Sequence, residues 1–160
     1  MHKMTSPTAP DSPQVITLPP FIYLGGLAVG VILHLLKPWP FFPESLAVSS
    51  GMVLIVTAIL LAITAIRGFI HAATNIDVRK PATCIVVTGP YRFTRNPMYL
   101  AMTLLVVGIA IGFNALWILV TLIPTLLVIQ FWVIRREEAY LTKKFGEEYL
   151  RYKAKVRPWL

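Results

Sequence analysis

A long run without charged residues constrains this chain more than any other feature. From residue 96 to residue 134 there is no Asp, Glu, Lys or Arg. At about 1.5 Å per residue, one helix of this length would be nearly twice as long as a bilayer's hydrocarbon core of about 30 Å. The Gly-Phe-Asn sequence at residues 112–114 has turn chemistry, because Gly and Asn tolerate unusual backbone angles. The run therefore predicts a hairpin of two membrane-spanning helices, over residues 98–111 and 115–134.

Two earlier segments have the same character. Residues 18–36 and 46–66 contain no charged residue, and each is near the roughly 20 residues that a spanning helix needs. Hydrophobic residues make up 56% of the 160-residue chain and charged residues only 14%, unlike an ordinary soluble domain. We expect an all-α integral membrane protein with about four transmembrane helices, in which residues 18–160 form a single domain.

The first residues of the chain differ from the rest. Residues 1–17 are rich in Pro, Ser and Thr, which predicts a flexible N-terminal tail. They lack the basic start and the small-residue cleavage site of a secretory signal. We therefore expect the first span to be retained.

The basic residues predict the topology. The chain has 15 Lys and Arg against 7 Asp and Glu, a formal net charge of +8, and all cations except Lys37 fall on one side of a four-span arrangement. Basic residues mark the cytoplasmic side of short loops. We expect a bacterial-type inner membrane protein with both termini and the site cytoplasmic. The charge then fits contact with anionic lipid headgroups, and we expect no nucleic acid as a partner.

Cysteine and histidine usage argues against a metal. Cys84 is the only cysteine, which excludes an internal disulfide and a cysteine-based metal site. His2, His34 and His71 are scattered and have no ligand spacing to a carboxylate. We expect no metal site.

A first polar motif precedes the third expected span. It reads Gly89-Pro90-Tyr91-Arg92-Phe93-Thr94-Arg95-Asn96-Pro97-Met98-Tyr99. Pro97 suits the first position of a helix, and Asn96 suits its cap. The free amides of that helix would face the cytoplasm, where Arg92 and Arg95 add positive charge suited to an anion. An equally open interpretation is that both arginines only contact lipid phosphates.

A second polar motif follows the fourth expected span, and the hairpin returns it to the same membrane surface. Glu137 and Glu138 lie about one turn beyond the apolar run, next to Arg135 and Arg136. One interpretation is a set of ion pairs with little net value. The other is that these carboxylates bind the ammonium group and ribose hydroxyls of a cofactor.

The last segment predicts a cytoplasmic amphipathic helix. Its apolar and aromatic residues fall near one helical face, and they are Leu141, Phe145, Tyr149 and Tyr152. Such a helix lies on the membrane or covers the site. Gly146 is expected to divide it into two short helices.

Together these residues resemble the isoprenylcysteine carboxyl methyltransferase and phospholipid methyltransferase superfamily of small integral-membrane enzymes. The usual pattern is Gly-Pro-Tyr, Arg-His-Pro-x-Tyr, two helices, Glu-Glu, Phe-Gly, spaced tyrosines and an arginine near a proline. The matching residues cover about the second half of the chain and are Gly89-Pro90-Tyr91, Arg95-Asn96-Pro97-Met98-Tyr99, Glu137-Glu138, Phe145-Gly146, Tyr149, Tyr152 and Arg157. The first half matches only as generic spans.

The resemblance implies S-adenosylmethionine as the methyl donor, and the absence of a Gly-x-Gly-x-x-Gly stretch agrees with a site outside any soluble nucleotide-binding domain. The implied cofactor-binding residues are Tyr91, Arg95, Asn96, Pro97, Tyr99, Glu137 and Glu138. Arg157, and less strongly Arg92, would lie near the methyl acceptor. That acceptor would be a lipophilic or membrane-associated molecule that enters from the bilayer.

The leading expectation for the reaction is carboxyl O-methylation of a prenyl-cysteine-like or other lipophilic acid. Arg157 would orient the carboxylate, and no base would be needed. Lipid amine N-methylation and thiol S-methylation are alternatives, with Glu138 as the nearest proton acceptor.

Two other classes of protein stay open. A sterol-type membrane reductase would bind a nicotinamide cofactor instead. A non-catalytic membrane scaffold is favoured by Asn96, which replaces the motif's histidine and forms hydrogen bonds without carrying a proton.

Overall fold

The computed structural model describes residue 13, residues 18–77 and residues 79–160. The expected flexible tail of residues 1–17 therefore lies, apart from residue 13, outside the described residues. In the part of the chain that is described, the protein is helical, and its β structure is limited to a parallel bridge between Thr94 and Arg157. The elements in order are α1 (Pro19–Leu36), α2 (Glu44–His71), the 3₁₀ turn η1 (Gly89–Arg92), α3 (Pro97–Gly112), α4 (Leu116–Val128), the π-helical turn η2 (Ile129–Ile134), α5 (Arg135–Phe145) and α6 (Glu147–Lys155).

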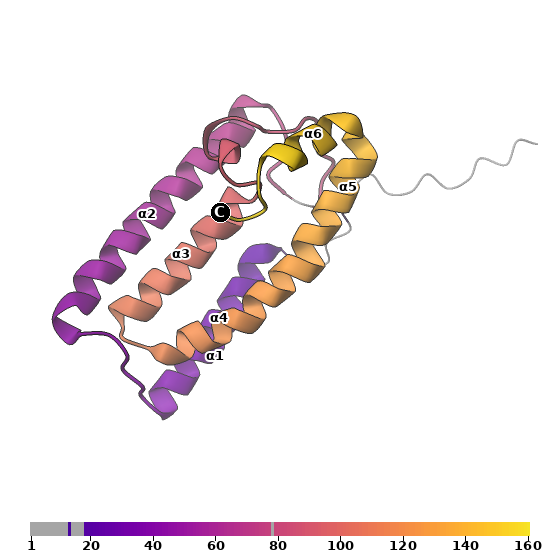
Figure 1. The fold of residues 1–160 in the computed structure, drawn as a ribbon. Coiled ribbons are helices and arrows are strands. Elements are labelled where there is room, and N and C mark those ends of the chain that lie inside the picture. The colour runs from indigo at the N-terminus through magenta and orange to yellow at the C-terminus, as the bar shows by residue number, and fades with distance from the viewer. Residues whose placement is uncertain (1–12, 14–17, 78) are drawn as a thin grey trace, which may run out of the picture.

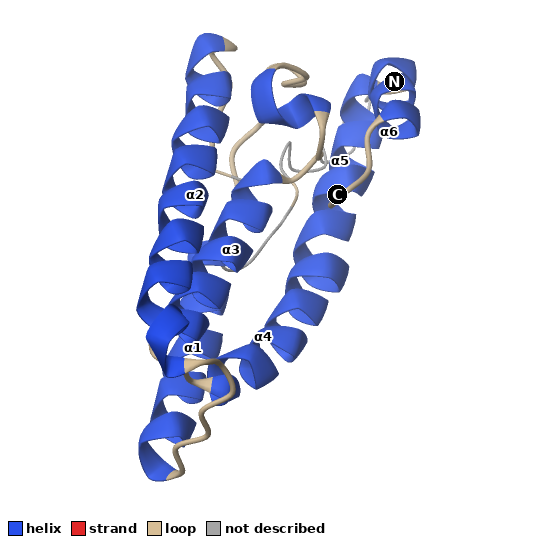
Figure 2. Ribbon diagram, turned by 60° about the vertical axis from the view of Figure 1, so that its left-hand side comes forward, coloured by secondary structure: helices blue, strands red, loops and turns tan. Residues whose placement is uncertain are grey.

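Among the described residues, three helices are long and apolar enough to cross a membrane. They are Pro19–Leu36, Glu44–His71 and the continuous helix Leu116–Phe145, which Figures 1 and 2 show as one long rod through α4 and α5. Pro97–Gly112 is a shorter apolar helix. Apolar helices thus form at all four predicted places.

The helices pack as two close pairs, α2 with α3 and α1 with α4 (Figure 1). Glycine allows the first pair to touch through the backbone, because a Cβ added at Gly51 would lie 2.6 Å from both the Gly108 carbonyl oxygen and the Gly112 Cα. The second pair contributes Tyr23, Ile118 and other residues to a buried apolar core. The outward faces carry many exposed hydrophobic side chains, as expected where lipid replaces water.

The turn between the third and fourth apolar helices forms where it was predicted. Asn114 has φ of 51°, in the left-handed region that asparagine tolerates. Its Oδ1 accepts hydrogen bonds of 2.8 Å from the backbone N–H groups of Phe41 and Phe42. Asn114 therefore also holds the loop between α1 and α2 at this end of the bundle.

Toward the other end, Pro124 lies inside α4, and because proline has no backbone N–H it leaves one carbonyl of the helix without its usual donor. The helix then widens into the π-helical turn η2. One extra residue in a turn rotates everything after it by about 100° relative to an uninterrupted α-helix. This turn therefore sets the direction in which the first side chains of α5 point.

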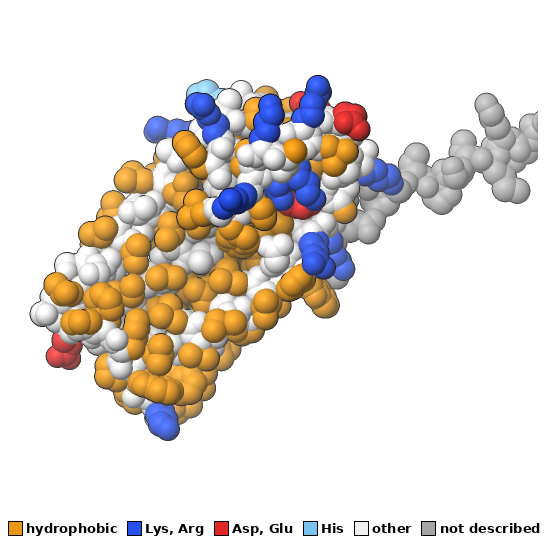
Figure 3. Space-filling view, viewed as in Figure 1, with side chains coloured by type: hydrophobic (Ala, Val, Ile, Leu, Met, Phe, Trp, Pro, Cys, Tyr) orange, Lys and Arg blue, Asp and Glu red, His pale blue; other side chains and the backbone are white. Residues whose placement is uncertain are grey.

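The predicted division of the final segment is confirmed. Gly146 has φ of 53° and separates α5 from α6, which turns back toward the start of α3 (Figure 1). Most Lys and Arg side chains on the visible face gather at this end, above a broad hydrophobic surface (Figure 3).

Candidate functional site

The fold brings the two polar motifs to the same end of the bundle. The Arg95 N–H donates a 2.9 Å hydrogen bond to the Arg157 carbonyl, and the Tyr152 hydroxyl donates a 2.7 Å bond to the Tyr91 carbonyl. These contacts join η1 and the start of α3 to α6 and the residues after it. The convergence predicted from the helical hairpin is thus observed in detail.

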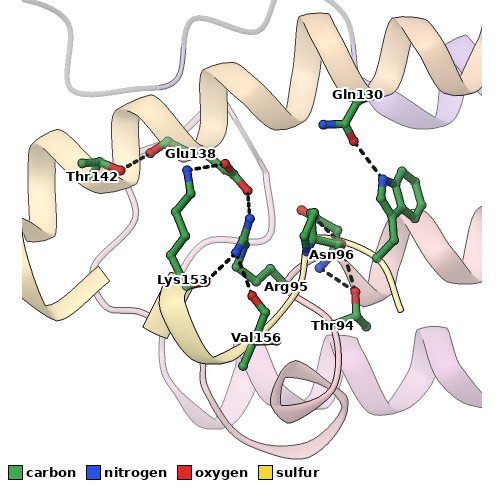
Figure 4. Close-up of polar contacts among 10 residues, drawn as sticks. Thr94, Arg95, Asn96, Gln130, Glu138, Thr142, Lys153 and Val156 are labelled. Carbon is green, nitrogen blue, oxygen red and sulfur yellow. Dashed lines mark hydrogen bonds and ion pairs between the residues drawn. The ribbon is translucent and has the colours of Figure 1, made fainter. Parts of the chain in front are cut away.

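Arg95 is the most extensively bonded side chain of the site (Figure 4). Its Nη1 donates to the carbonyls of Lys153 at 2.9 Å and Val156 at 2.7 Å, and its Nη2 forms an ion pair with Glu138. The side chain is only 7% exposed. Two carbonyls and one carboxylate therefore fix the plane of the guanidinium group.

Glu138 is held as an ion by two cations. Besides Arg95, it receives Lys153 Nζ at 2.7 Å. Burial by itself raises the pKa of Glu138, but the hydrogen bonds and positive charges of Lys153 and Arg95 outweigh it and lower the pKa below its ordinary value. Glu138 is consequently ionised at neutral pH.

Glu137 has a different environment, although it is the neighbouring residue. It lies beyond the apolar part of its helix, which ends at Ile134. Burial raises the pKa of Glu137 to about 7, although the Tyr99 hydroxyl, which donates a 2.7 Å hydrogen bond to Oε1, opposes the rise. The pair thus contains one carboxylate that is charged at neutral pH and one whose pKa lies near neutrality.

Two adjacent cavities share this wall. One has a volume of about 130 Å³ and the other about 410 Å³. The residues that line both are Phe69, Ile76, Asp77, Tyr91, Arg95, Asn96 and Glu137. Glu138, Tyr149 and Tyr152 line only the smaller cavity, which is the more polar, whereas Met98 and Met102 line only the larger.

Two buried polar atoms on the shared wall lack a partner. Among the described residues, neither the Tyr91 hydroxyl nor Arg95 Nε has a hydrogen-bond partner. Burial raises the pKa of Tyr91, so its hydroxyl keeps its proton. Buried polar groups are nearly always satisfied in native proteins, and these two atoms are available to a ligand.

Asn96 is the N-cap residue of α3, as predicted, but its side chain makes no capping hydrogen bond. Its Nδ2 instead donates a 2.8 Å hydrogen bond to the Pro158 carbonyl. The expectation that the side chain caps the helix was therefore wrong. The carbonyl of a residue far along the chain competes successfully for the amide.

The predicted cofactor-binding residues all lie on these cavities. Tyr91, Arg95, Asn96 and Glu137 line both, Glu138 lines the smaller, and Pro97 and Tyr99 line the larger. The two arginines expected near an acceptor, Arg92 and Arg157, are exposed and line neither cavity.

Several contributors were missed by the sequence analysis. Thr94 is buried and donates a 3.1 Å hydrogen bond to the Pro158 carbonyl, and Gln130 accepts a 2.8 Å bond from the Trp159 indole. Gln130 had a usable signal, because a polar amide in an apolar run needs a partner. Phe69 had none, since it is an ordinary apolar residue at the end of α2.

Comparison with known proteins agrees with this arrangement. Residues 46–148 match the model of the phospholipid methyltransferase family. An uncharacterised protein of Haemophilus influenzae is 45% identical over 65 residues, which are 39% of this chain and all of that protein. No solved structure shows a significant match. Because the family match covers more than half of the chain and includes Arg95 and the Glu137–Glu138 pair, this protein belongs to the phospholipid methyltransferase family.

Proposed function

We propose that the protein is an integral-membrane methyltransferase that uses S-adenosylmethionine, with its site at the cytoplasmic end of four spanning helices. The observation that carries the proposal is the wall shared by the two cavities. On that wall lie both the fixed guanidinium of Arg95 and the titratable carboxyl of Glu137. Family membership supports methyl transfer, and the basic residues at this end support the orientation.

The residues present fit this cofactor. S-adenosylmethionine supplies a methyl group that is already activated on a positively charged sulfur. The unpartnered Tyr91 hydroxyl and Arg95 Nε suit its polar oxygens, and the two glutamates suit its ammonium group. The free amides at the start of α3 add attraction for a carboxylate.

The protein's contribution is mainly positioning. Because the Lys153 and Val156 carbonyls hold Arg95 in place before any ligand binds, no reorganisation of that side chain is needed. Alignment of reacting groups lowers barriers by several kcal/mol. The mainly apolar lining of the larger cavity suits a lipophilic acceptor.

The larger cavity favours an amine or a thiol of a lipophilic acceptor. Its charged residues are Asp77, Glu137 and Arg95, and Glu138 already neutralises Arg95. An uncharged nucleophile that must lose a proton suits these surroundings better than a carboxylate. Glu137, which is held by one hydroxyl rather than two cations, is the proposed proton acceptor in place of Glu138.

Carboxyl O-methylation of a prenyl-cysteine-like or other lipophilic acid is the second candidate. It is favoured by the N-terminus of α3, since Pro97 and Met98 line the larger cavity. The exposed positions of Arg92 and Arg157 support it less. A screen of lipophilic amines, thiols and acids, with a labelled methyl donor, separates the two candidates.

Calorimetry on protein in nanodiscs tests the proposal, with S-adenosylmethionine and S-adenosylhomocysteine as ligands and NADPH as the counter-ligand. We expect saturable binding of both sulfur compounds and none of NADPH. The E137Q/E138Q variant should lose this binding. A matched control is E147Q/E148Q, because that second glutamate pair is exposed at the start of α6.

The other outcomes are equally informative. Binding of NADPH alone would indicate a membrane reductase. No binding of either ligand to folded protein would indicate a non-catalytic scaffold. Unchanged binding by folded E137Q/E138Q protein would refute the site assignment while leaving the fold intact.

A further inference from the structure

The residues after α6 accept four hydrogen bonds from the first polar motif. Residues 156–159, the tail segment, run beside Thr94 through the parallel bridge at Arg157. Pro158 alone accepts two hydrogen bonds through its carbonyl, from Thr94 Oγ1 at 3.1 Å and Asn96 Nδ2 at 2.8 Å. The Arg157 and Val156 carbonyls accept from the backbone and side chain of Arg95. The position of the motif therefore depends on the position of the tail segment.

The tail segment has a single side-chain hydrogen bond to the helical bundle among the described contacts. The Trp159 indole N–H donates a 2.8 Å bond to Gln130 Oε1, and the Trp159 ring packs against the buried core (Figure 4 shows Gln130 and its bond). Arg157 is exposed, and its structural contribution is made through its backbone. Trp159 is thus the side chain that anchors this segment.

Gln130 lies in the π-helical turn η2, seven residues before Glu137 on the same continuous helix. Turns of this kind occur frequently at functional sites because they re-aim side chains. The one helix therefore presents Gln130 to the tail segment and Glu137 to the cavities. This places the anchor and the acidic side of the site on one rigid element.

We propose that the Trp159–Gln130 hydrogen bond positions Arg95 and Asn96 for ligand binding, by fixing the tail segment whose carbonyls hold them. Trp159 and Gln130 are positioning residues, since neither lines either of the two cavities described above. The proposal rests on the proposed function only for the identity of the ligand. Its structural half, which is the effect of the hydrogen bond on the position of Arg95, does not depend on the proposed function.

The structural half is tested without any ligand. The Arg95 N–H donates to the Arg157 carbonyl, so its hydrogen–deuterium exchange reports directly on the contact with the tail segment. W159F keeps an aromatic ring, although a smaller one, and loses the indole donor, and Q130L removes the acceptor at similar volume. We expect each variant in nanodiscs to speed exchange at Arg95 by about twofold to tenfold, the range for one lost hydrogen bond.

Two further variants distinguish the loss of the Trp159–Gln130 hydrogen bond from a general loss of structure. Q130E retains an acceptor oxygen, unlike Q130L, and we expect exchange of the Arg95 N–H to stay slow in this variant. W39F removes an indole at the opposite end of the bundle, where Trp39 contacts Trp117, and we expect no change at Arg95. The double variant W159F/Q130L should behave like either single variant, because both remove the same interaction.

The functional half is tested by calorimetry with S-adenosylmethionine on the same variants. We expect W159F and Q130L to raise its Kd by up to about tenfold, with Q130E and W39F close to wild type. If wild type binds this ligand but exchange and Kd are unchanged in W159F and Q130L, the positioning proposal fails and the proposed function stands.

The remaining outcomes also decide between the two ideas. If exchange at Arg95 accelerates while wild type does not bind the ligand, the structural half stands and the proposed function fails. Fully additive effects in the double variant would overturn the proposal, because they show that the two residues act independently. An increase in exchange throughout the bundle, rather than near Arg95, would overturn it as well.

Discussion

The Tyr99 hydroxyl donates a 2.7 Å hydrogen bond to Glu137 Oε1, which joins the first turn of α3 to the first turn of α5. This bond lowers the pKa of Glu137, whereas burial raises it to about 7. One hydrogen bond contributes about 1 kcal/mol, so Y99F should raise that pKa by about one further unit. Infrared titration of the carboxyl band measures it, with E137Q identifying the band. If the midpoint of this titration is the same in Y99F and wild type, the bond has no influence on the pKa of Glu137.

The raised pKa of Glu137 also makes stability depend on pH. The folded protein holds a proton on this group up to about pH 7, whereas the unfolded chain releases it near the ordinary value of 4.5. The stabilising effect of that proton is therefore complete below pH 4.5 and lost as the pH rises through 7. We expect E137Q to be more stable than wild type at pH 8, by ~3 kcal/mol at most, and equal to it at pH 4.5. Thermal unfolding of both proteins at both pH values checks this. The prediction is contradicted if E137Q and wild type differ in stability by the same amount at pH 4.5 and pH 8.

Arg95 should be far more important for stability than Lys153, although both bind Glu138. R95M leaves a largely buried carboxylate with a single partner and leaves two carbonyls without donors, so we expect a loss of about 3 kcal/mol or more. The Lys153 side chain is 40% exposed, and K153M should cost less than about 1 kcal/mol. Equilibrium unfolding in mixed detergent compares the two. Equal losses would show that the ion pair with Arg95 is no stronger than the exposed one.

The close contact between α2 and α3 predicts that alanine substitutions at two glycines have very different effects on stability. An added methyl group at Gly51 would meet backbone atoms at 2.6 Å, whereas at Gly25 nothing lies within 4 Å. We expect G51A to destabilise the protein by about 1–3 kcal/mol through overpacking. G25A should be neutral or stabilising by up to about 1 kcal/mol, because alanine favours a helix. Thermal unfolding of both variants is the measurement, and a tolerated G51A would show that the helices separate easily.

The four apolar helices were predictable because a charge is costly in a bilayer, so long uncharged runs mark the spanning segments. The expected second span, residues 46–66, is contained in a helix that runs from Glu44 to His71. A charged residue such as Arg67 ends the apolar part of a helix but does not end its hydrogen bonding. Charge therefore predicts spans well and predicts helix ends poorly.

The π-helical turn could not be predicted, because nothing in the sequence of residues 129–134 distinguishes it from an ordinary α-helical turn. The site was predictable at the level of which motifs meet, since the length of the hairpin brings both to one surface. Which atoms meet was not predictable. The side chain of Arg157 was expected to orient the methyl acceptor, whereas the structure shows its carbonyl accepting a hydrogen bond from the Arg95 N–H. Every residue has a carbonyl, so the sequence does not indicate which carbonyl makes such a contact.

The hydrogen bonds to Arg95 also set an order of events during synthesis. Lys153 and Val156, whose carbonyls hold its guanidinium, follow all four apolar helices in the chain. The ribosome therefore makes the apolar helices before it makes the groups that fix Arg95. A chain that ends before residue 153 therefore keeps the four apolar helices and lacks the carbonyls that fix the Arg95 guanidinium group.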